Sequence, residues 1–93
     1  MITIYARGVV KEDKIEEYKE IATQMMNETR KEKGCINYTL FQDMNDPQVF
    51  CFIEHWENQE CIDAHNLSAH FMELVPKMRE LRLESSINFY KEV

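Results

Sequence analysis

Apolar and polar residues alternate from Ile2 to Val10, which is typical of a β-strand. From about Asp13 the apolar period lengthens to three or four residues, and this change predicts an amphipathic helix. The apolar stripe of that helix consists of Ile15, Tyr18, Ile21, Ala22, Met25 and Thr29. Asp13 is the expected N-cap, and Gly34, after the charged run 31–33, is the expected stop.

The middle of the chain predicts a β-hairpin. Two apolar segments, 35–42 and 49–56, flank a turn over 44–47 that contains Asn, Asp and Pro. The last apolar segment, 83–93, predicts a final strand.

Two further helices are expected between the hairpin and the last strand. Asn58 can cap a helix that runs to about residue 66, and Ser68 can cap a second one, which Pro76 will disturb after its first turns. The apolar positions of the second helix are Phe71, Leu74, Val75, Met78 and Leu81. The order βαββαβ predicts an α+β, ferredoxin-like subunit, in which helices cover one face of an antiparallel sheet.

The strand 49–56 is apolar on both of its faces. One face carries Val49, Cys51, Ile53 and His55, and the other carries Phe50, Phe52, Glu54 and Trp56. A sheet face open to water normally carries polar residues, and a large apolar patch favours association. The pattern therefore predicts a homodimer packed sheet to sheet, with His55 facing the interface.

Composition narrows the class of protein. The 93 residues are 44% hydrophobic and 30% charged, which predicts one globular domain over 1–93. A net charge of −6 argues against nucleic acid as a partner. Neither a membrane-spanning run nor a signal peptide is expected. Cys35, Cys51 and Cys61 form no CxxC spacing, and three free thiols predict a cytoplasmic location.

Residues 54–71 hold the only tryptophan and all three histidines. Their Glu54-x-Trp56 pattern, the spacing of His65, Ser68 and His70, and the segment 34–38 resemble the antibiotic biosynthesis monooxygenase family. The resemblance covers about residues 2–92. It implies a dimeric α/β barrel similar to quinol monooxygenases, which oxygenate quinone- or phenol-like aromatics without metal, flavin or haem.

That activity requires a base and groups that steady an oxyanion. The expected catalytic residues are His65, His70 and Asn37. The expected substrate-binding residues are Trp56, Tyr38, Arg7 and Glu54. Each also has a structural alternative: a histidine can be a hydrogen-bonded core residue, Trp56 can be core, and Glu54 can form an ion pair with an arginine.

Haem and metal sites are weaker alternatives. The Asn, Trp and His of haem-degrading relatives fall on Arg7, His65 and Val75, and none matches. His65 and His70 are five residues apart, which does not align them on one helical face, although a break at Ser68 could bring them together with Glu54 or Glu57. We therefore expect a cofactor-independent monooxygenase, with an isomerase, a small-molecule binder or a purely structural dimer as the alternatives.

Overall fold

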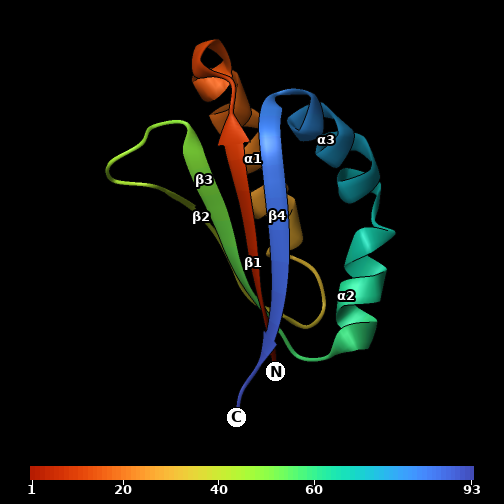
Figure 1. Ribbon diagram of the computed structural model, residues 1–93. Coiled ribbons are helices and arrows are strands. Elements are labelled where there is room, and N and C mark those ends of the chain that lie inside the picture. The colour runs from red at the N-terminus through yellow and green to blue at the C-terminus, as the bar shows by residue number, and fades with distance from the viewer.

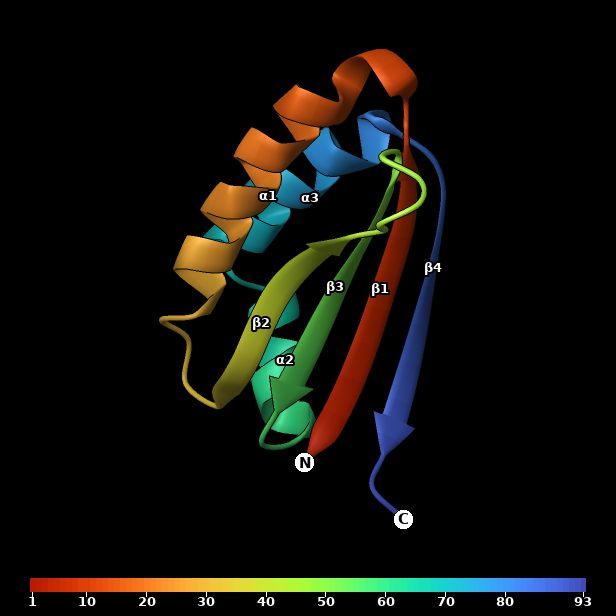
Figure 2. The ribbon, with the colours of Figure 1, turned by 90° about the vertical axis from the view of Figure 1, so that its left-hand side faces the viewer.

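The computed structural model describes residues 1–93 as an antiparallel sheet with helices on one face (Figures 1 and 2). The strands are β1 (Ile2–Val10), β2 (Cys35–Gln42), β3 (Val49–Trp56) and β4 (Arg82–Lys91). The helices are α1 (Ile15–Thr29), α2 (Gln59–Asn66) and α3 (Ala69–Glu80), and a 3-10 turn, η1, spans Glu12–Lys14. The strand order β2-β3-β1-β4 confirms the ferredoxin-like arrangement.

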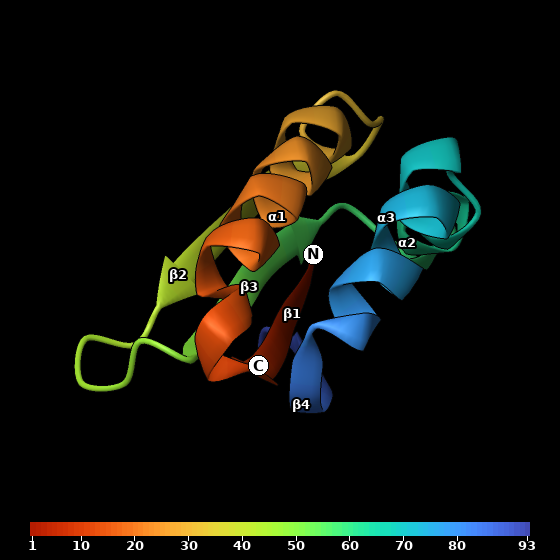
Figure 3. The ribbon, with the colours of Figure 1, turned by 90° about the horizontal axis from the view of Figure 1, so that it is seen from above.

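The three helices form one layer. Figure 3 shows α1 above the β2 side of the sheet, and α2 and α3 above the β4 side. None of these helices has the length and apolar character needed to cross a membrane. The predicted apolar stripe of α1 is confirmed, because Tyr18, Ala22, Met25 and Thr29 are all buried.

The expected ends of α1 were wrong. Lys14, not Asp13, occupies the N-cap position, because the chain enters the helix through η1, whose Lys14 N–H donates to the Lys11 carbonyl. The helix ends at Thr29 instead of at Gly34. Gly34 immediately precedes β2 and has a φ of 81°, where its lack of a Cβ allows the chain to turn.

The caps of α2 and α3 are confirmed. The Asn58 side chain accepts the Cys61 N–H, and Ser68 Oγ accepts the Phe71 N–H. Pro76 does not end α3, which continues to Glu80. The hydrogen bond that proline removes would have gone to the carbonyl of Met72, a residue exposed to solvent, so its loss is inexpensive.

The two faces of the sheet differ in burial. On the covered face, Phe50, Phe52 and Trp56 pack in a core with residues from all three helices. On the other face, called the open face below, Tyr5 and Tyr90 are 42% and 51% exposed and stack edge to face. The expected apolar character of both faces of β3 is therefore present, but only one face is covered within the chain.

Candidate active site

Glu32 is positioned by the connection between α1 and β2. Its N–H donates to the Thr29 carbonyl at 3.0 Å, and its carbonyl accepts the Cys35 N–H at 3.3 Å. The Gly34 carbonyl accepts the Glu57 N–H at 2.9 Å, which ties this connection to the corner between β3 and α2. A Cβ at Gly34 would collide with Cys61, so the close approach requires glycine.

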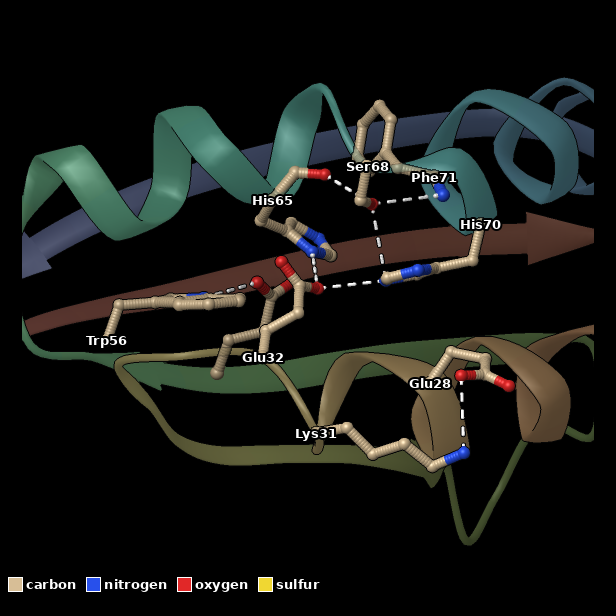
Figure 4. Close-up of polar contacts among 9 residues, drawn as sticks. Glu28, Lys31, Glu32, Trp56, His65, Ser68, His70 and Phe71 are labelled. Carbon is tan, nitrogen blue, oxygen red and sulfur yellow. Dashed lines mark hydrogen bonds and ion pairs between the residues drawn. The ribbon is translucent and has the colours of Figure 1, made fainter.

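The Glu32 carboxylate joins two histidines (Figure 4). His65, in the last turn of α2, has its Nδ1 2.6 Å from Glu32 Oε2, and His70, in the first turn of α3, has its Nε2 2.9 Å from the same oxygen. Ser68 lies between the two helices and places its Oγ 3.2 Å from His70 Nε2. The break at Ser68 thus brings together two histidines that a continuous helix would separate.

The hydrogen-bond pattern assigns the protons. Ser68 Oγ–H donates to the His65 carbonyl at 2.7 Å, so the same oxygen must accept from His70 Nε2. The Glu32 carboxylate accepts from both rings, so His65 carries its proton on Nδ1 and His70 on Nε2. In the neutral form of His65, Nε2 therefore has a free lone pair.

His65 lies among aromatic rings. The ring centroids of Trp56, Phe71 and Tyr38 are 4.8, 5.1 and 5.6 Å from its own. Burial lowers the pKa of His65, while the Glu32 carboxylate opposes this effect. A ring whose pKa is lowered is more often neutral near pH 7 and can accept a proton there.

Glu54 is a second buried acid near this cluster. It is 5% exposed, and its Oε1 accepts the Trp56 indole N–H at 2.9 Å. Burial raises the pKa of Glu54 to about 7, although the Trp56 hydrogen bond opposes the shift. No arginine forms the ion pair that was considered for Glu54. Burial also raises the pKa of Tyr38 well above its usual value, so the phenol stays protonated.

A cavity of about 620 Å³ separates α2 and α3 from the sheet. Glu54, Tyr38 and His65 line it together with apolar side chains such as Phe52, Phe71 and Phe89. Its volume falls in the range of small-molecule sites, and its mixture of apolar walls with a few convergent polar groups is typical of them.

The structure places Asn37 apart from the other two expected catalytic residues, His65 and His70. It pairs with His55 in the sheet, and its Nδ2 lies 3.2 Å from His55 Nδ1 on the open face, away from His65. Alternation from Cys35, which pairs with Trp56, would place Asn37 on the covered face. A register shift between Cys35 and Asn37 reverses this order.

Arg7 is also separated from the histidine cluster. It borders the cavity, but its guanidinium extends over the open face to Glu84, with Nη1 3.8 Å from Oε1. Trp56 is fully buried, as the structural alternative for this residue proposed. The structure therefore gathers His65, His70, Trp56, Tyr38 and Glu54, places Arg7 at the border of the cavity, and leaves Asn37 apart on the open face.

Sequence reasoning missed Glu32. Its neighbours Lys31 and Lys33 make it part of a charged run, which normally indicates a solvated surface. Yet its side chain is only 15% exposed. The one available signal was Gly34, which marks a close approach of this connection to another segment.

Comparisons with known proteins agree with this architecture. The family model described as antibiotic biosynthesis monooxygenase matches residues 1–77. The Synechocystis protein sll1783 is 34% identical over 83 residues, covering 88% of this chain and 56% of its own length. YcnE of Bacillus subtilis, whose name proposes a monooxygenase, is 33% identical over 81 residues, covering 87% of this chain and 85% of its own.

A solved structure of a conserved protein from Methanosarcina mazei has a TM-score of 0.96 and 32% identity, covering 99% of this chain and 92% of that one. The chain therefore belongs to the antibiotic biosynthesis monooxygenase family. It spans a little over half the length of the Synechocystis relative.

Proposed function

We propose that the protein is a monooxygenase that uses O₂ to oxidise a small hydroquinone- or phenol-like aromatic without a metal, flavin or haem. The observation that carries this proposal is the Glu32–His65 pair at the wall of the cavity. Membership of the monooxygenase family and the name of YcnE support the same class of reaction.

In this mechanism, His65 Nε2 accepts a proton from the bound ring, and Glu32 holds the resulting imidazolium through Nδ1–H. The deprotonated ring supplies electrons to O₂. One oxygen atom enters the product and the other leaves as water, with both hydrogens drawn from the substrate. Protonated Glu54, the Tyr38 phenol and the Arg82 guanidinium are among the cavity-lining groups that can donate to a ring oxyanion.

The test is oxygen uptake by chelator-treated protein with a panel of hydroquinones and anthrones, combined with product mass under ¹⁸O₂. We expect uptake, one ¹⁸O atom in the product, and a rate lower by about 10²- to 10⁴-fold in His65→Ala. His55→Ala, which changes the histidine of the open face, should stay within about threefold. His65→Gln provides a second variant if His65→Ala fails to fold.

Absence of uptake on every substrate would overturn the proposal, and ring binding without turnover would favour the binder instead. Uptake that His65→Ala and His65→Gln leave unchanged would remove His65 from the mechanism. Uptake that disappears on chelation would contradict the cofactor-free reaction.

We also propose that the open face packs against a second copy of the chain. Tyr5, Phe41 and Tyr90 are all more than two-fifths exposed there, next to the half-buried Ile53. An exposed apolar surface of this kind favours self-association. Light scattering at micromolar concentration should give twice the 11.2 kDa chain mass, and Ile53→Asp should reduce it to the single mass. A wild-type protein of single mass would rule the dimer out.

A further inference from the structure

We propose that Glu32, His65 and His70 form a binding site for a divalent cation of the zinc class. Each residue offers one ligand atom, and these atoms all lie within 4.8 Å of one another. They come from three separate segments: the α1–β2 connection, the end of α2 and the start of α3. Convergence of two imidazoles and one carboxylate from different elements distinguishes this group from the pairs of neighbouring charges along the exposed helices.

The donor set fits zinc better than magnesium or calcium. Two imidazole nitrogens and one carboxylate oxygen are the ligands of many catalytic zinc sites, whereas the harder cations prefer oxygen alone. Three protein ligands leave a fourth tetrahedral position for water. The histidine side chains are 5% and 18% exposed and that of Glu32 is 15% exposed, so the site is largely shielded yet reachable from solvent.

The present contacts are those of a cluster bridged by protons. Glu32 Oε2 is 2.6 and 2.9 Å from the two nitrogens, closer than the roughly 3.4 Å between ligands in a tetrahedral zinc site. A cation would replace the two bridging protons, so the carboxylate would move outward and the rings would turn inward by on the order of 1 Å. Glu32 can make this shift because it lies in a connection instead of in a helix.

Zinc bound at this site would change the chemistry of His65. This expectation rests on the proposed function, in which His65 is the base. With the cation on His65 Nδ1, the remaining proton of the neutral ring moves to Nε2. The lone pair that would accept the substrate proton is then lost, so zinc should inhibit turnover.

The primary test is calorimetric titration of chelator-stripped protein with ZnCl₂, without substrate. We expect one zinc per chain with a Kd of micromolar order, and no competition from millimolar Mg²⁺. His70→Ala should weaken binding by about tenfold or more, and His55→Ala should leave it unchanged. Glu32→Gln should also weaken it, and this variant keeps the size of the side chain.

Anomalous diffraction at the zinc edge should place the ion between the three side chains. Two results would overturn the proposal. One is no binding at about 100 μM zinc, and the other is equal binding by the wild type, His70→Ala and Glu32→Gln. Zinc binding by a protein that oxidises no substrate would support the site and defeat the proposed function. Oxygen uptake by a protein that does not bind zinc would support the proposed function and defeat the zinc site.

Discussion

His65 and His55 lie on opposite faces of the same sheet and differ in what anchors them. His65 lies in the last turn of α2, over the covered face, where the Glu32 carboxylate meets its Nδ1 at 2.6 Å. His55 lies on the open face, where an amide of Asn37 meets its Nδ1 at 3.2 Å. A carboxylate only accepts, so it forces the proton onto Nδ1 of His65, whereas the Asn37 Nδ2 only donates and leaves Nδ1 of His55 as the acceptor.

The two histidines therefore differ in burial, in tautomer and in the charge of the hydrogen-bond partner. On the covered face, burial and a fixed tautomer leave a neutral ring whose free nitrogen can act as a base. On the open face, the ring is half-buried and its amide partner brings no charge. This difference suggests that the covered face carries the chemistry, while the open face serves packing against a second copy.

The largest expected effect of a substitution falls on Trp56, which neighbours His55 in sequence but points to the covered face. Trp56→Ala removes a fully buried ring and its hydrogen bond to Glu54, so the free energy of unfolding should fall by about 3–5 kcal/mol. His55→Ala should cost about 1 kcal/mol or less. Urea unfolding of both variants measures the contrast, and equal losses would contradict the division between the faces.

A pH-dependent effect of up to about 3 kcal/mol is expected from Glu54. Its pKa in the folded chain is about 7 against an ordinary 4.5, so between these values the folded chain holds a proton that the unfolded chain has lost. The contribution of Glu54 to stability is therefore greatest at low pH and falls as pH rises towards 7. Glu54→Gln, which keeps an acceptor for Trp56, should remove this fall.

The measurement for Glu54 is urea unfolding of wild type and Glu54→Gln at pH 5 and pH 8. The free energy of unfolding of Glu54→Gln, relative to that of the wild type, should be higher at pH 8 than at pH 5. Glu84→Gln, at an exposed acid of the open face, is the matched control and should show no such gain. A constant difference between wild type and Glu54→Gln would show that the carboxyl of Glu54 titrates normally.

Glu32→Gln is expected to lower the rate of oxygen uptake, an effect smaller in free energy than the two stability effects above. The amide is a weaker acceptor and cannot stabilise an imidazolium, so oxygen uptake should fall by about 10- to 100-fold. Asn37→Ala alters the corresponding partner of His55 and should stay within about threefold. Steady-state rates on the best substrate measure both variants. A larger loss in Asn37→Ala than in Glu32→Gln would assign the chemistry to the open face.

The sequence predicted the strands and the caps of α2 and α3 well because these depend on local pattern, whereas both expected ends of α1 were wrong. Alternation set the bounds of β1, and Asn58 and Ser68 act on residues three positions away. The site was harder to predict. The bonds from Glu32 to the histidines span 33 and 38 positions, a separation that no local period encodes. The face on which Asn37 lies could not be read from the alternation either, because one bulge reverses the face of every later residue of the strand.

The smallest expected effect separates the two helix caps. Ser68→Ala and Asn58→Ala each remove a side chain that accepts a backbone N–H, so each should cost about 1 kcal/mol of stability. Only Ser68 also contacts a histidine of the cluster, with its Oγ 3.2 Å from His70 Nε2. Zinc on His70 Nε2 would break this contact, so Ser68→Ala should tighten zinc binding severalfold, whereas Asn58→Ala should leave it unchanged. Thermal unfolding and zinc titration of the two variants separate these effects. Equal zinc affinities would mean that Ser68 acts only as a cap, and that Glu32 alone orients His70.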